Sequence, residues 1–213
     1  MSMKKPTTPY ERADRELKVM LRTVRKEFNK HRLKNFLPFD EINVLRVKKT
    51  AKSLYKKLDS INRDFYMRIA QEAYKAAGGK NKLGKKWLLA FLERSDPVTE
   101  YVYTHEVERK RDRFFESILA LLAIEHTTLD IEKAYKRAAD LWSRQTEQYE
   151  INIVGCARVQ AFEDNGEEYV QWFTQEDEKV CEICAPRNGE IYPINEIPDR
   201  HYNCRCWVES IDQ

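Results

Sequence analysis

The chain has 213 residues, of which 42% are hydrophobic and 34% are charged, with only 6 Gly and 7 Pro. This length allows one sizeable core with a small appendage but falls short of the roughly 250 residues of a (β/α)8 barrel enzyme. The low content of Gly and Pro argues against a β-sandwich. No run approaches the roughly 20 apolar residues of a membrane span, and the charged start has no apolar secretory segment, so we expect no membrane association.

The net charge of +3 is distributed unevenly along the chain. Residues 1–100 contain 25 Lys and Arg against 12 Asp and Glu, whereas residues 151–213 contain 5 against 13. This asymmetry indicates two different surfaces. The basic half suits contact with a polyanion such as double-stranded DNA, but the interpretation we favour is a set of amphipathic helices with solvated Lys and Arg faces.

Apolar spacings of three and four predict two long helices, over residues 11–33 and 41–77. Residues 36–39 interrupt the pattern, Asp40 can cap the second helix, and Gly78-Gly79 can end it. The apolar positions that define the two helices are Leu17, Met20, Leu21, Val24 and Phe28, then Leu45, Leu54, Leu58, Ile61, Phe65, Ile69 and Ala73.

Three more helices are expected further along the chain. Residues 85–92 predict a short buried helix, and Ser95-Asp96-Pro97 predicts the start of another, over 98–124. The pair Thr127 and Asp130 is typical of a capping box. The apolar spacing after it predicts a helix from residue 131 to about 162, and Cys156 on this helix is expected in the core. Helices this long favour an extended bundle or scaffold part over a compact enzyme.

The sequence changes character after the turn signal Asp164-Asn165-Gly166. Residues 168–174 are rich in residues that favour strands, and a short apolar pair, Ile191-Tyr192, follows a turn at 187–189. The predicted fold is therefore mostly α: an extended long-helix region followed by a small α+β, zinc-ribbon-like C-terminal domain.

Four of the five cysteines fall within 26 residues of this C-terminal region, with a histidine between the two pairs. A Cys-x-x-Cys turn presents two thiolates to one ion, and the later His-x-x-Cys repeats this spacing. If the last two cysteines lie on a strand, they point to the same face. The candidate metal ligands are Cys181, Cys184, His201, Cys204 and Cys206. A tetrahedral site needs four of these five, which leaves either Cys206 or His201 outside it.

Several interpretations of this cluster stay open. We favour a structural Zn2+, because thiolate and imidazole suit zinc and a small domain needs a cross-link. A disulfide pair would need an oxidising compartment, and a thioredoxin-type redox pair would need a βαβ pattern that is absent. Five soft ligands would saturate a catalytic ion, so we expect no enzyme and no catalytic residues. The other histidines, His31, His105 and His126, are scattered and are interpreted as surface or core residues.

The order and spacing of these residues resemble the C-terminal domain of the phage Mu F-like minor head proteins. The similarity covers roughly residues 130–211. The matching positions are Thr146, Glu147, Asn152, Trp172, Val180, Cys181, Glu182, Ile183, Cys184, Gly189, His201, Tyr202, Asn203, Cys204, Arg205 and Cys206. In this family a proline usually stands just before the histidine, whereas here Asp199 and Arg200 separate Pro198 from His201. Arg205 is interpreted as an exposed residue.

The resemblance implies a component of the virion, or of the procapsid in the host cytoplasm, that binds the portal vertex during head assembly. Its expected partners are the portal protein, major capsid or scaffolding proteins, and packaged double-stranded DNA, whose packaging or ejection it would aid. Residues 1–128 would form a divergent basic helical region and residues 129–213 the Mu F-like domain. The rival hypotheses are a sequence-neutral DNA-binding zinc protein and a metal-dependent nuclease or toxin-like effector.

Overall fold

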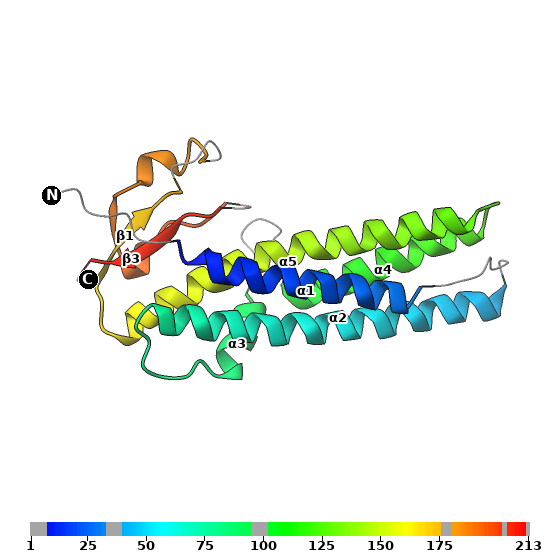
Figure 1. The fold of residues 1–213 in the computed structure, drawn as a ribbon, viewed down its shortest axis with the longest axis horizontal. Coiled ribbons are helices and arrows are strands. Elements are labelled where there is room, and N and C mark those ends of the chain that lie inside the picture. The colour runs from blue at the N-terminus through cyan, green and yellow to red at the C-terminus, as the bar shows by residue number, and fades with distance from the viewer. Residues whose placement is uncertain (1–7, 33–39, 95–101, 176–179, 202–203, 212–213) are drawn as a thin grey trace. The chain divides into compact units, whose positions relative to one another are not determined.

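The computed structural model of the chain describes residues 8–32, 40–94, 102–175, 180–201 and 204–211 (Figure 1). Within these ranges five helices precede a small sheet. The helices are α1 (Tyr10–Lys30), α2 (Glu41–Ala76), α3 (Lys85–Leu92), α4 (Tyr103–Leu122) and α5 (Thr128–Asp164). The predicted fold class, mostly α with a small α+β C-terminal region, is confirmed. None of the described helices combines the length and the apolar character that a bilayer crossing requires.

The apolar spacing read from the sequence accounts for most of the buried helical surface. Met20, Val24 and Phe28 of α1 are all buried, as the pattern predicts. Leu45 of α2 was expected in the core but is 65% exposed. The buried positions on that part of α2 include Asn43 and Val47, and a residue two places from each lies on the opposite face of a helix with 3.6 residues per turn.

The ends predicted from caps are confirmed for α2 and α5, whereas the helix predicted over 98–124 begins only at Tyr103, after an extended Val102. The backbone N–H of Asn43 donates to Oδ1 of Asp40 at 2.7 Å, and Gly78, with φ of +85°, follows the end of α2. Thr127 and Asp130 form the predicted capping box, because each backbone N–H donates to the side chain of the other. The hydroxyl and the backbone N–H of Thr127 both donate to Oδ2 of Asp130, and they lower the pKa of that carboxyl. The predicted interruption at 36–39 and helix start at 95–97 lie outside the described residues.

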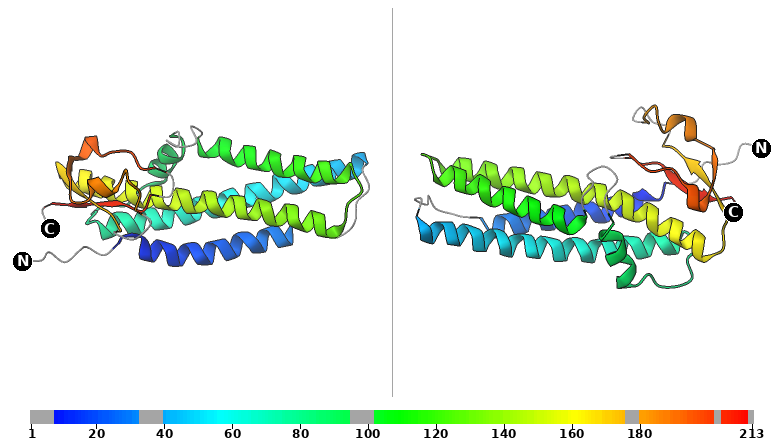
Figure 2. Two further views of the ribbon diagram at one scale, coloured as in Figure 1. Left: turned by 90° about the horizontal axis from the view of Figure 1, so that it is seen from above. Right: turned by 180° about the vertical axis from the view of Figure 1, so that it is seen from behind.

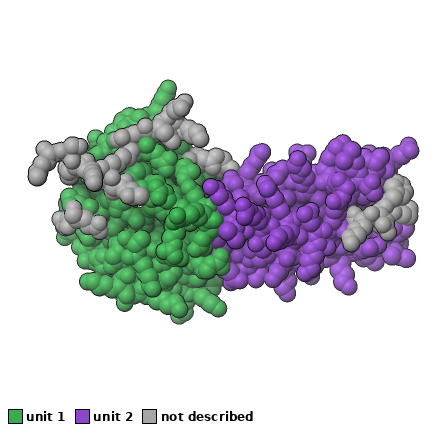
Figure 3. Space-filling model, in the orientation of Figure 1, with its two compact units in different colours: residues 1–17, 66–91, 148–213 green, residues 18–65, 92–147 purple. Residues whose placement is uncertain are grey.

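The chain folds into two compact units, each assembled from separate parts of the sequence (Figure 3). Unit 1 consists of residues 1–17, 66–91 and 148–213, and unit 2 consists of residues 18–65 and 92–147. The predicted division of the chain at residue 128 stays a prediction.

Unit 2 is a set of packed helices with an aromatic core. Five residues connect α4 to α5, and α4 lies alongside the first half of α5 in both views of Figure 2. The rings of Phe114 and Tyr135 meet edge to face at 4.9 Å between these two helices. In the same unit, buried Asn62 of α2 accepts a hydrogen bond from the Trp142 indole and donates one to Thr146, so polar contacts fix the register of α2 against α5.

The sheet lies in unit 1 and consists of three short antiparallel strands in the order β2-β1-β3. The strands are β1 (Tyr169–Phe173), β2 (Ile191–Pro193) and β3 (Trp207–Ser210). Along β1, Val170 and Trp172 are buried whereas Tyr169 is half exposed, which is the alternation of a strand with one covered face. The structure thus places a strand where residues 168–174 favour one, and the apolar pair Ile191-Tyr192 lies on β2.

Candidate metal centre

The first cysteine pair occupies a tight turn just before the short helix η1 (Ala185–Arg187). The backbone N–H groups of Cys184 and Ala185 both donate to the carbonyl of Cys181, at 3.0 and 2.9 Å. The N–H of Cys184 also lies 3.3 Å from the Sγ of Cys181. Because a donor aimed at sulfur favours the thiolate form, this turn favours the thiolate of Cys181.

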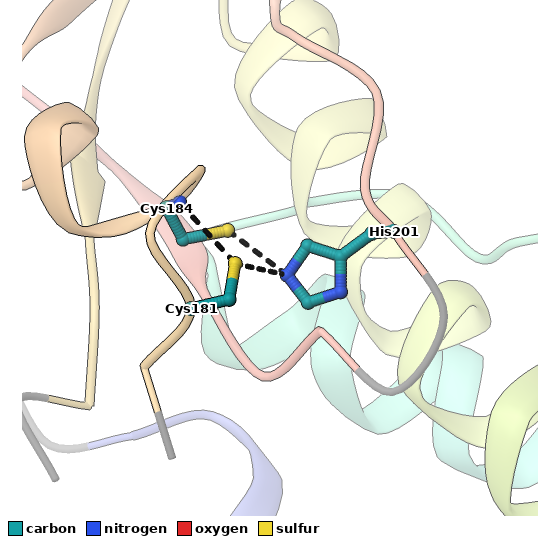
Figure 4. A group of neighbouring side chains, drawn as sticks. All are labelled: Cys181, Cys184 and His201. Carbon is teal, nitrogen blue, oxygen red and sulfur yellow. Dashed lines mark hydrogen bonds between the residues drawn. The ribbon is translucent and has the colours of Figure 1, made fainter. Parts of the chain in front are cut away.

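The second part of the cluster reaches the same point from residues 201–206. Nε2 of His201 lies 3.0 Å from the Sγ of Cys181 and 3.1 Å from the Sγ of Cys184 (Figure 4). The Sγ atoms of Cys184 and Cys204 are 3.7 Å apart. Two groups of three side chains result, Cys181, Cys184 and His201, and Cys184, Cys204 and Cys206, with the ligand atoms of each group within 4.8 Å of one another. Cys184 belongs to both groups, so the structure gathers all five side chains that the sequence singled out.

These distances fit a tetrahedral ion. With Zn–S bonds of about 2.3 Å and Zn–N bonds of about 2.0 Å, the tetrahedral edges are about 3.8 Å between sulfurs and about 3.5 Å between sulfur and nitrogen. The observed separation of the sulfurs of Cys184 and Cys204 matches the first value, and the contacts of His201 are a few tenths of an ångström shorter than the second. The Cys/His groups could therefore hold a metal ion.

The thiols around Cys204 differ in their pKa values, that is, in how readily each loses its proton. A hydrogen bond from Cys206, followed by its other neighbours, lowers the pKa of Cys204 to about 5, and the same bond together with burial raises the pKa of Cys206. Burial raises the pKa of Cys184 to about 12. A negative charge therefore resides on a nearly inaccessible sulfur, which a bound cation would compensate.

The predicted side-by-side placement of Cys204 and Cys206 holds, although the reason differs from the one expected. The two residues precede β3 rather than lying on a strand. Both are buried, at 2% and 5% exposure, and both belong to the same group of sulfurs.

Residues that the sequence analysis did not connect with the cluster hold it against α1. The hydroxyl of Tyr10 is buried and donates to the carbonyl of Cys206 at 2.9 Å, and the guanidinium of Arg200 donates to that hydroxyl at 3.4 Å. Burial raises the pKa of Tyr10 to about 12. Arg205 is exposed, as expected, but it also donates to Asp14 of α1 at 2.7 Å and lies over the ring of Tyr10.

Two further contacts bind the same region to α5. Arg158 of α5 is buried and forms an ion pair with Glu209 of β3. On the same helix, a Cβ added at Gly155 would overlap the guanidinium of Arg200, so a side chain at this position would have to displace that group. A glycine in the middle of an otherwise strong helical pattern was the available sequence signal for such a close approach.

The remaining candidate residues lie apart from this cluster. The half-buried His31 and the buried His126 each have Nδ1 near a backbone carbonyl of their own segment, at 2.9 and 3.1 Å, and His105 is exposed. Cys156 was predicted to lie in the core, but it is half-buried on α5. None of the cysteines forms a disulfide in the described chain, which includes all five.

Comparison with known proteins confirms the resemblance seen in the sequence. Residues 121–209 match the family model described as Phage Mu protein F like protein. This stretch contains α5, β1, β2, all of β3 except Ser210, and the five Cys and His side chains. No curated protein and no solved structure matches the chain.

The packing of Arg200 on α5 predicts an unusual effect of a glycine substitution. In a helix interior, Gly→Ala ordinarily stabilises by about 1 kcal/mol, but Gly155→Ala should instead lower the free energy of unfolding by about 1–3 kcal/mol because the methyl group displaces the guanidinium. Urea denaturation measures the change. In an Arg200→Ala background the penalty should vanish, and a Gly155→Ala protein at least as stable as the parent would contradict this packing.

Proposed function

We propose that this chain, whose residues 121–209 are those of a phage Mu F-like protein, is a minor head protein that binds the portal vertex and acts in head assembly. The observation that carries the proposal is the coincidence of the family match with the Cys/His cluster. The stretch that matches the family is the stretch whose five soft side chains converge in space. A head protein of this kind resides in the virion, and its partners are other head proteins.

The burial of the cluster supports a role in holding shape. Cys184 and Cys204 are 1–2% exposed, and Cys181 and His201 are half-buried, so an ion among them would have little room for a substrate or an activated water. A catalytic metal keeps an open coordination position, whereas the two groups of Cys and His side chains together offer more ligands than a tetrahedral ion needs. We therefore assign the chain a structural role in the head and no reaction.

We further propose that the cluster binds one Zn2+ through Cys181, Cys184, His201 and Cys204. The close approach of His201 to both sulfurs of the first pair supports the histidine as a ligand. Cys206 then serves as the hydrogen-bond donor to the thiolate of Cys204, the relation that already lowers the pKa of Cys204. Such a donor stabilises a metal-bound thiolate without entering the coordination sphere.

Elemental analysis of the purified full chain tests this ligand set. We expect about one zinc per chain in the parent protein and in Cys156→Ser, and a loss of most of the zinc in Cys184→Ser, since Cys184 is shared by both groups of ligands. Cys206→Ser should keep the ion with reduced affinity, by about 10- to 100-fold for an outer-shell partner. If Cys206→Ser loses the zinc while His201→Ala keeps it, the proposed set is wrong.

The portal assignment is tested by assembly. We expect the chain to sediment with heads and with portal rings when it is coexpressed with the portal protein of the same phage, and we expect Cys184→Ser to lose this association if the small domain makes the contact. The major capsid protein expressed alone with the chain is the control for general adhesion. Absence of the chain from heads, together with failure to bind isolated portal rings, would contradict the proposed function.

A basic face on α2 supports contact with packaged DNA as part of this function. Six basic residues are exposed on residues 42–58 of α2, a stretch without an acidic residue, and none of the six is in an ion pair with any described residue. They are Arg46, Lys48, Lys49, Lys52, Lys56 and Lys57. Lys48, Lys52 and Lys56 follow one another every four residues, about 6 Å apart along one side of the helix. Such a row can track a phosphate backbone without reading bases.

The salt dependence of DNA affinity measures this contact. Each neutralised phosphate contributes about 0.9 to the slope of log K against log salt, so the triple variant Lys48→Gln, Lys52→Gln and Lys56→Gln should flatten the slope by about 2.7. The matched control replaces Lys133, Lys136 and Arg137 of α5 with Gln and removes the same charge. An equal effect of the two triple variants would show that DNA responds to net charge and not to this face.

A further inference from the structure

A pocket of about 700 Å³ opens in unit 1 between the second half of α2 and the residues that lead into α3. Its lining from α2 includes Met67, Gln71 and Lys75, and its lining from the other side is the run 82–85. None of its lining residues belongs to the Cys/His cluster or to the basic face of α2. Its volume is within the range of sites that enclose several ligand side chains.

The charge of this pocket is positive and uncompensated. Lys75, Lys82 and Lys85 are exposed at its edge, and none of the three forms an ion pair within the described part of the chain. The acidic residue of the lining, Glu72, is already paired with Arg12 at 2.8 Å. The three lysines therefore remain available for an anionic ligand.

Below the lysines the lining is apolar. Leu83 is 6% exposed and Met67 is half-buried, and the lysines of the lining have aliphatic stems that can add to an apolar surface. A nucleic-acid phosphate backbone would leave this apolar surface in contact with water. A peptide with one apolar side chain between acidic ones would cover it and reach the lysines at the same time.

Gln71 adds a polar feature that suits a peptide. Its amide nitrogen and oxygen are buried, and neither has a hydrogen-bond partner among the residues that the structure describes. Buried amides of this kind are usually satisfied in folded proteins. A rotation of the side chain would offer one donor and one acceptor to the pocket that Gln71 lines, which is the complement of the C=O and N–H of a peptide group.

We propose that this pocket binds an acidic segment of another protein, with one apolar side chain against Met67 and Leu83, acidic side chains on the three lysines, and the peptide backbone on Gln71. That the protein is another component of the phage head rests on the proposed function. The pocket then supplies an attachment point that is independent of the Cys/His cluster and of the basic face.

Fluorescence anisotropy of the full chain with a labelled peptide tests the proposal. The probe is fluorescein-Asp-Glu-Asp-Leu-Glu-Asp-Glu, compared with the same peptide carrying Ser in place of Leu and with one carrying Asn and Gln in place of the acids. Binding should weaken by at least about tenfold in Lys82→Glu/Lys85→Glu, since two attractive charges become repulsive, and by about tenfold on loss of the Leu side chain. Lys48→Glu/Lys52→Glu carries the same charge change on the basic face and should leave binding within about twofold.

Each other outcome overturns the proposal. Equal loss in the two double variants would assign the binding to overall charge, and equal affinity for the Leu and Ser peptides would remove the apolar contact. Tighter competition by a 12-base-pair duplex than by unlabelled peptide, lost in Lys82→Glu/Lys85→Glu, would make this a nucleic-acid site. All substituted lysines are exposed, and unchanged circular dichroism and thermal midpoints show that the variants are folded. A chain that binds the peptide but does not enter heads would contradict the proposed function alone, and a chain that enters heads but ignores the peptide would contradict this inference alone.

Discussion

The convergence of four sulfurs and one imidazole is the constraint on which the C-terminal part of unit 1 depends. The three strands have five, three and four residues, and a sheet of this size is marginal without support. The segments that join the strands carry the ligands. Cys181 and Cys184 lie between β1 and β2, and His201, Cys204 and Cys206 lie between β2 and β3. A single ion at this point would close both connections, and its binding energy would become folding energy for the sheet.

The cluster is also the point from which the sheet is attached to the helices of its unit. The carbonyl of Cys206 receives the hydroxyl of Tyr10 from α1, Arg200 reaches Tyr10 while packing on Gly155 of α5, and Arg158 of α5 pairs with Glu209 of β3. Removing one partner of such a buried network leaves the others without compensation, so its members depend on one another. The protein thus positions a small domain on long helices through polar contacts that begin at the cluster, and this arrangement suits a part whose function is to hold a fixed shape in an assembly.

The sequence predicts the local structure of this fold but few of its long-range contacts. Apolar periodicity and caps such as Asp40 predicted the helices because each signal acts within a few residues of the chain. The metal-ligand candidates were visible for the same reason, since their types and spacings are specific. The contact between Tyr10 and Cys206 joins residues 196 positions apart, and no local pattern marks Tyr10 for it. The prediction that Leu45 is buried was wrong, because the buried residues nearest to it on α2, Asn43 and Val47, lie two positions before and after it.

Hydrogen exchange of the backbone amides, measured before and after removal of metal by a chelator, tests this dependence most directly. The account predicts that the amides of β1 and β3 lose most of their protection when the ion is removed, while those of α4, which lies wholly in unit 2, keep theirs. Restoring Zn2+ should restore the protection. Strand amides that stay equally protected after chelation would contradict the account, because the sheet would then stand without the cluster.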